Sequence, residues 1–236
     1  MTGTLYLIPT TLGDCNADAV LPSEVKAQIR RLCYFIAESP KTARAFLKVV
    51  GSERPLQSLA IERLDHNTPP GSIDSLLAPV VAGQDAGLVS EAGCPAIADP
   101  GALLVRRAHE CGVRVVPLVG PSSILLALIA SGLESQRFAF HGYLPVKTPA
   151  REQTIRDIES RSRRNRETEI FIETPYRNGQ LVEALLAACR PETLLSVATD
   201  ITLPTESVRT LRVGQWKAQK PNIRNRPTVF LLLAVQ

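Results

Sequence analysis

Short apolar and β-branched runs alternate with amphipathic stretches through the first half of the chain. Apolar side chains in these stretches recur at helical spacing, as in Val25, Ile29 and Leu32, which predicts helices that pack one face on a sheet. Because a helix between two strands brings them together in the same direction, the alternation predicts a parallel sheet. The expected strands are residues 5–9, 33–37, 59–64, 87–90 and 113–117.

Two helix starts are indicated by an oxygen-bearing side chain before a proline. Ser39-Pro40 and Asp99-Pro100 each place an N-cap oxygen before a residue whose fixed φ suits the first helical position. The second of these helices is expected to end at Gly112, because glycine readily takes the left-handed conformation that closes a helix.

The second half predicts a different sheet. Residues 122–131 are apolar on every side, which predicts a helix buried between layers, and we place the domain junction beside it. The last strands follow one another without a helix, so this sheet should be mixed or antiparallel. The pattern therefore predicts an α/β protein with a parallel-sheet domain, 1–119, and a mixed-sheet domain, 120–236. The second domain's expected strands are 137–141, 169–173, 195–199, 208–213 and 229–235, with helices near 150–163 and 178–189.

Composition narrows the class of protein. The longest apolar runs have seven residues, whereas a membrane span needs about 20, so we expect no membrane segment. The N-terminus lacks the basic start of a secretory signal, which favours the cytoplasm. Five widely spaced cysteines without a C-x-x-C motif are expected to be mostly reduced and buried, and three scattered histidines give little support to a metal site.

Charge differs between the two halves. Residues 121–236 carry 16 basic and 11 acidic side chains, a net charge of +5, whereas residues 1–120 carry 11 and 12. Four arginines lie within residues 161–166, and six basic residues with no acidic one lie within 209–226. Such surfaces attract polyanions, although a single cluster of this kind is more often an ordinary solvated surface.

The most unusual segment is the loop after the fourth expected strand, residues 90–101. The G-x-G-x-x-G and P-loop patterns of nucleotide-binding proteins are absent from the chain. The loop consists mainly of small residues and lies at the carboxyl end of a parallel strand, where open α/β sheets bind ligands. Small side chains expose peptide groups, which suits a ligand held by main-chain hydrogen bonds. The alternative is a plain strand-to-helix connection, which usually takes about 2–6 residues.

Six stretches in order along most of the chain resemble the tetrapyrrole methylase superfamily. Within it they are most similar to the branch of bacterial small-subunit ribosomal RNA methyltransferases that modify the 2′-oxygen of a cytidine. The stretches are Leu5-Tyr6-Leu7-Ile8-Pro9-Thr10, Ala37-Glu38-Ser39, Leu88-Val89-Ser90-Glu91-Ala92-Gly93-Cys94-Pro95-Ala96-Ile97-Ala98-Asp99-Pro100-Gly101, Val115-Val116-Pro117-Leu118-Val119-Gly120-Pro121-Ser122-Ser123, Phe140-His141-Gly142-Tyr143-Leu144-Pro145 and Ile172-Glu173-Thr174-Pro175-Tyr176-Arg177.

The resemblance implies a two-domain methyltransferase of class III fold. It implies S-adenosylmethionine bound in the cleft between an N-terminal parallel sheet and a C-terminal mixed sheet, and a homodimer. By the same resemblance, the cofactor would be contacted by Pro9, Thr10, Ala92, Gly93, Cys94, Ile97, Ser122, Ser123, Glu173, Ile201, Pro227 and Thr228.

Some positions differ from the ribosomal enzymes. Those proteins have Glu-Asp-Thr-Arg where this chain has Glu38-Ser39-Pro40-Lys41, and their His-Asn-Glu stretch survives only as Asp65-His66-Asn67-Thr68. Methyl transfer from an activated sulfonium chiefly needs donor and acceptor in line, and a base near an acceptor hydroxyl would help. Glu38, His66 and Glu91 are the catalytic candidates, because each lies at or just beyond the carboxyl end of an expected strand.

Three functions remain open from the sequence. The first is an S-adenosylmethionine-dependent methyltransferase acting on RNA, favoured by the resemblance and the basic second half. The second is a methyltransferase for a tetrapyrrole or another small anionic acceptor, whose carboxylates the same arginines could hold. The third is a binding protein without catalytic activity that keeps the fold and the cofactor.

Overall fold

The computed structural model describes residues 1–235, and the chain divides into two compact units. The first is Met1–Ser122 and the second begins at Ser123. Each unit has its own sheet and its own buried apolar core. The units are therefore described separately.

The first unit is built on a five-stranded sheet in which every pairing is parallel, as predicted. The strand order is β3-β2-β4-β1-β5. The bounds differ from the predicted ones by no more than one residue at either end: β1 Thr4–Ile8, β2 Tyr34–Ala37, β3 Ala60–Arg63, β4 Ala86–Val89 and β5 Arg114–Pro117.

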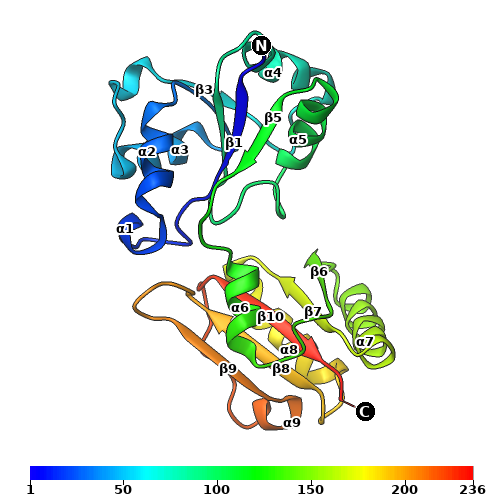
Figure 1. Cartoon of the computed structure of the whole chain (residues 1–236). Helices are drawn as coiled ribbons and strands as arrows, with labels where there is room; N and C mark the ends of the chain where they lie inside the picture. The colour runs from blue at the N-terminus through cyan, green and yellow to red at the C-terminus, as the bar shows by residue number, and fades with distance from the viewer. Residues whose placement is uncertain (236) are drawn as a thin grey trace. The chain divides into compact units, whose positions relative to one another are not determined.

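Helices cover both faces of this sheet (Figure 1). Helices α2 (Ser23–Arg31) and α3 (Pro40–Val50) bury Ile29 and Leu47 against one face. Helices α4 (Ile73–Val81) and α5 (Gly101–Glu110) cover the other. The shorter helical segments are α1 (Ala17–Val20), η1 (Leu56–Ser58) and η2 (Pro70–Ser72).

One of the two predicted caps is confirmed and the other is wrong. Ser39 caps α3, because its hydroxyl accepts a hydrogen bond from the backbone N–H of Thr42. Asp99 caps nothing: α5 begins at Gly101 and its N-cap residue is Pro100 in a helical conformation. The predicted end at Gly112 is confirmed, since this residue follows the helix with φ +68°.

The second unit has a mixed sheet of five strands, also as predicted, in the order β6-β7-β10-β8-β9. The β6–β7 pair is parallel and the other three pairs are antiparallel. The strands are β6 Phe138–Tyr143, β7 Thr168–Ile172, β8 Leu194–Thr199, β9 Ser207–Arg212 and β10 Thr228–Leu233. Its helical segments are α6 (Ser123–Ser131), α7 (Thr148–Asn165), η3 (Pro175–Arg177), α8 (Asn178–Ala188) and α9 (Val213–Trp216).

Two expectations about burial are wrong. Helix α6 packs on β8, β9 and β10 and buries Ala127 and Leu128, but Leu125 and Ile129 are 49% and 76% exposed, because only one side of the helix meets the sheet. All five cysteines are free as expected, yet only Cys189 is buried and the others are half-buried. No helix in residues 1–235 is both long and apolar enough to span a membrane.

Candidate functional site

The carboxyl ends of β1 and β4 are tied together in the first unit. The backbone N–H of Thr10 donates to the carbonyl of Gly93 at 2.9 Å, and the Ser90 hydroxyl donates to the same carbonyl at 2.7 Å. This places the predicted residues Pro9 and Thr10 beside the small-residue loop after β4. The carbonyl of Gly93 therefore accepts hydrogen bonds that hold the loop in place. The other peptide groups of the loop are the candidates for hydrogen bonds to a ligand.

The loop has an unusual backbone. Gly93, Ala96 and Ala98 all have positive φ, at 74°, 64° and 62°. The positive φ of Gly93 favours glycine, and a Cβ there would lie 3.1 Å from a methyl carbon of Leu12, so the Leu12 side chain would have to shift. Left-handed alanines are uncommon and destabilising, and they indicate a loop held in one particular shape by its surroundings.

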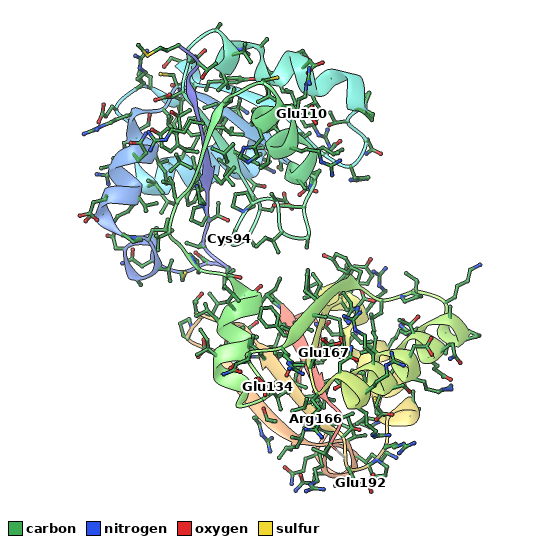
Figure 2. All side chains as sticks on the ribbon, turned by 45° about the vertical axis from the view of Figure 1, so that its right-hand side comes forward. Cys94, Glu110, Glu134, Arg166, Glu167 and Glu192 are labelled. Atoms are coloured by element: carbon green, nitrogen blue, oxygen red, sulfur yellow. The ribbon has the colours of Figure 1, made fainter. Side chains whose placement is uncertain are left out.

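The third strand end at this edge belongs to β5. A Cβ at Gly120 would lie 2.3 Å from Cγ of Pro9, so the segment after β5 passes directly against the end of β1. The Cys94 thiol lies at the same edge (Figure 2) and donates to the carbonyl of Pro121 at 3.5 Å. Burial raises the pKa of Cys94, which keeps this thiol protonated. Ala92 and Ile97 are exposed on the loop, and Ser122 ends the unit.

The three catalytic candidates also lie close together. Burial raises the pKa of Glu38, the charge of Glu91 raises it further, and the charge of His66 opposes both. The Glu91 carboxylate accepts from the Thr42 hydroxyl at 3.4 Å, next to the cap of α3. Glu91, which follows β4, and His66, which follows β3, are therefore each near enough to Glu38, which follows β2, to influence it electrostatically.

Asp99 joins this cluster, although the sequence suggested only a cap there. Burial and then the charge of Glu38 raise the pKa of Asp99 to about 6. One oxygen of its carboxyl group, Oδ1, is buried without a hydrogen-bond partner in residues 1–235. Asp99 and Glu38 face a small cavity of about 10 Å³, whose other lining residues are Leu64, Leu88, Val89, Pro95, Ala96, Pro100 and Gly101.

In the second unit, the remaining predicted residues gather mainly at one end of the sheet. Glu173 follows β7, Ile201 follows β8, and Pro227 and Thr228 are at the start of β10. Thr228 pairs with Thr199 in register, and the hydroxyls of these two residues lie 3.3 Å apart. Since β10 runs antiparallel to both β7 and β8, its start meets their ends. The last predicted residue, Ser123, begins α6.

Glu173 is buried and only half of its carboxylate is paired. Oε1 accepts from the Arg177 guanidinium at 2.7 Å and from the backbone N–H of Thr174 at 2.6 Å. Oε2 is buried without a partner in the described chain. Burial favours a higher pKa of Glu173, but the bonds from Arg177 and Thr174 outweigh it, so the pKa lies below its ordinary value and the side chain is charged.

A second ion pair holds the neighbouring loops. Arg226 donates to the buried carboxylate of Asp200 at 2.8 Å, and to the backbone carbonyls of Thr205 and Asn222 at 2.6 and 2.9 Å. The backbone N–H of Asp200 donates to the carbonyl of Pro227 at 2.9 Å. Ile201 and Pro227, both predicted to contact the cofactor, are thus fixed by one network.

Residues 37–216 match the family described as Tetrapyrrole (Corrin/Porphyrin) Methylases. The chain belongs to this family. Among curated proteins, it is 32% identical to Ribosomal RNA small subunit methyltransferase I of Escherichia coli O157:H7, over 99% of this chain and 78% of that protein. The protein of the same name from Xylella fastidiosa strain Temecula1 is 31% identical over 99% of this chain and 81% of its own length.

Two solved structures of methyltransferases show the same fold. The methyltransferase CobJ superposes with a TM-score of 0.65 at 17% identity and covers 99% of this chain and 95% of its own. The uroporphyrin-III-C-methyltransferase of Thermus thermophilus superposes with a TM-score of 0.56 at 18% identity, over 99% of this chain and 93% of that one. The expected class III fold is confirmed, as is an S-adenosylmethionine-dependent methyltransferase.

Each unit holds a buried polar atom that fits a polar ligand such as S-adenosylmethionine. Thr10 Oγ1 in the first unit and Glu173 Oε2 in the second, both on residues predicted to contact the cofactor, are buried and lack a partner in residues 1–235. An unpaired buried polar atom costs about 1–3 kcal/mol, which a ligand with hydroxyl and amino groups would recover. No group of three His, Cys, Asp or Glu side chains in the same residues is placed to hold a metal ion.

Sequence reasoning missed four residues of these clusters. They are Asp99, Arg177, Asp200 and Arg226. A signal existed for Arg177, which lies four residues after Glu173 in a stretch already matched to the family. No local pattern could have paired Asp200 with Arg226, because 26 residues separate them. The contacts between these residues and a bound cofactor stay a prediction.

Proposed function

We propose that this methyltransferase acts on small-subunit ribosomal RNA and transfers the methyl group to a ribose 2′-hydroxyl. The observation that carries the proposal is the likeness over 99% of the chain to proteins named Ribosomal RNA small subunit methyltransferase I. The basic charge of residues 121–236 supports it, since RNA backbones are attracted to such a surface. A ribosomal RNA substrate also favours the cytoplasm as the location.

Methyl transfer requires the protein chiefly to align the donor with the acceptor and to provide a group that accepts the acceptor's proton. When bound, S-adenosylmethionine supplies an activated methyl group on a sulfonium. The protein then has to hold the acceptor oxygen in line and take up its proton. Glu38 is the base in this proposal, because its raised pKa makes the carboxylate a better proton acceptor. The charge of Glu91 raises the pKa of Glu38 and the charge of His66 lowers it, and the Glu91 carboxylate accepts a hydrogen bond from the Thr42 hydroxyl.

The protein works as a homodimer in this proposal. Leu125 and Ile129 lie one turn apart on α6, on the side that faces away from the second unit's sheet. Two exposed large apolar side chains at this spacing form a face suited to association with a second copy. Sedimentation velocity checks this, with a dimer expected for the natural chain and a monomer for Ile129→Asp.

The test of the function uses small ribosomal subunits from a strain that lacks the gene. Label from the methyl donor should enter the RNA, and alkaline hydrolysis should leave it in a dinucleotide, because a methylated 2′-oxygen cannot attack the adjacent phosphate. Label on a base, or only on small metabolites, contradicts the proposal. Donor binding without transfer to any fraction would favour the binding-protein alternative.

The role of Glu38 is tested with a matched pair of variants. Glu38→Gln should lower kcat about 10²–10⁴-fold while donor affinity is retained, the range expected when a general base is removed. Glu62→Gln is the control, since Glu62 is an exposed carboxylate on β3 outside the cluster. Equal kcat values for the two variants would remove Glu38 from the mechanism.

A further inference from the structure

Two of the four tyrosines expose their rings at the end of the second unit's sheet that holds Glu173. Tyr143 ends β6 and pairs in register with Ile172, the residue just before Glu173. Tyr176 lies in the short helix η3 that follows. Their exposed fractions are 55% and 69%, whereas Tyr34 is buried in the first unit's core. Large exposed aromatic rings beside a functional cluster indicate a contact surface.

The Tyr176 ring is held in position by the ion pair between Arg177 and the buried Glu173. Arg177 donates to the buried Glu173 carboxylate at 2.7 Å and to the Tyr176 hydroxyl at 3.2 Å, and its Cζ lies 5.2 Å from the ring centroid. Glu173 first, and to a lesser degree Tyr176 and Tyr143, raise the pKa of Arg177. The guanidinium therefore stays charged and fixes the ring, so that less side-chain entropy is lost when a flat ligand stacks on it.

The charge around the tyrosines suits a polyanion. The backbone N–H of Asn225 donates to the carbonyl of Pro175 at 3.2 Å, which places the end of the basic segment 209–226 next to η3. Lys220 and Arg224, both exposed, belong to this segment. Aromatic rings beside basic side chains form the surface with which proteins bind single-stranded RNA, since every base offers a flat face and every nucleotide a phosphate.

We propose that Tyr143 and Tyr176 form a stacking platform for an unpaired base of the RNA substrate, beside Glu173, which is predicted to contact the cofactor. The inference rests on the proposed RNA methyltransferase function and specifies how that substrate is recognised. The platform is sequence-tolerant, because stacking does not read hydrogen-bond patterns. It holds a nucleotide while the ribose to be methylated is presented to the donor.

Steady-state kinetics on small ribosomal subunits test the platform within the reaction. Tyr143→Ala and Tyr176→Ala should each raise KM for RNA about 5- to 150-fold, the effect of losing one stacked base. Tyr176→Phe should retain most of the affinity, since it keeps the ring. Phe138→Ala is the matched control, because Phe138 is a 42% exposed aromatic residue at the opposite end of β6. Its KM should be unchanged.

Calorimetric measurement of donor affinity distinguishes an RNA base from the donor's adenine as the group that stacks on the two tyrosine rings. Both alanine variants should bind S-adenosylmethionine as the natural chain does. A loss of donor affinity with an unchanged KM for RNA would overturn the platform and assign the rings to the donor's adenine. An unchanged KM together with unchanged donor affinity would overturn it as well.

A direct measurement of RNA binding tests the platform even if the protein does not methylate ribosomal RNA. Fluorescence anisotropy compares a short unstructured oligoribonucleotide with the same strand carrying abasic sites. The natural chain should bind the strand with bases more tightly, and the Tyr143→Ala/Tyr176→Ala double variant should lose the difference. Absence of methyl transfer by the natural chain would refute the proposed function, whereas equal binding of both strands by the natural chain would refute the platform.

Discussion

The ion pair between Asp200 and Arg226 is predicted to stabilise the second unit strongly. Asp200 is buried, and its carboxylate also accepts a hydrogen bond from the Thr205 hydroxyl at 2.6 Å. Arg226→Ala removes the counter-charge and leaves a buried carboxylate. Loss of one partner of a buried pair costs about 3–5 kcal/mol, and because Arg226 is only half-buried we expect about 2–4 kcal/mol.

The lone tryptophan gives a convenient assay. Trp216 is buried in the second unit and its indole N–H donates to the carbonyl of Leu195 at 2.8 Å, so its fluorescence should change when this unit unfolds. With a urea dependence of about 2 kcal/mol per molar, the middle of the range for small proteins, Arg226→Ala should lower the urea midpoint by about 1–2 M. The loops that hold Ile201 and Pro227 should loosen too, and donor affinity should fall with stability.

A double-variant cycle decides whether the pair itself is responsible. Asp200 has φ +51°, a conformation that asparagine tolerates, so Asp200→Asn removes the charge without adding backbone strain. This change should destabilise the natural chain but restore stability in the Arg226→Ala background, since it removes the stranded charge. Strictly additive effects, within about 0.5 kcal/mol, would refute the reasoning.

Two more predictions concern the first unit. Gly93→Ala should weaken donor binding, because it combines a left-handed backbone with crowding against Leu12, whereas Gly112→Ala, with φ +68° and open space around it, should cost only the strain of about 1–2 kcal/mol. The pKa of Asp99 is raised to about 6 in the fold, so its contribution to stability is present below pH 4 and lost as the pH rises to about 6. Asp99→Asn should therefore gain stability relative to the natural chain across that interval in urea titrations; a constant difference would contradict this.

Much of the fold could be predicted because the local pattern and the long-range structure agree. The strands of both sheets are short apolar runs with clear limits, and the helices between the first five impose parallel pairing. Ser39 caps α3 as expected, because the side chain, the proline and the amphipathic pattern all favour the same start. Such agreement between levels is what makes an element predictable.

The errors arise where tertiary structure decides between local options. The Asp99-Pro100 pair resembles the Ser39-Pro40 pair, but the left-handed Ala96 and Ala98 turn the chain so that the helix starts at Gly101 and the Asp99 carboxyl group faces the cavity instead. The all-round apolar pattern of α6 could not reveal that only one side of the helix meets a sheet.

In the candidate site, too, the local sequence predicts some features and the tertiary structure decides the others. Residues at strand ends could be proposed from the sequence, because the apolar pattern stops there and chemistry-bearing side chains begin. What those side chains contact depends on which strands are neighbours. Glu38 and Glu91 influence each other because β2 lies beside β4, although their segments are separated by β3 along the chain. Strand order is a property of the whole domain, so the electrostatics that would make Glu38 a base could be found only once the sheet was known.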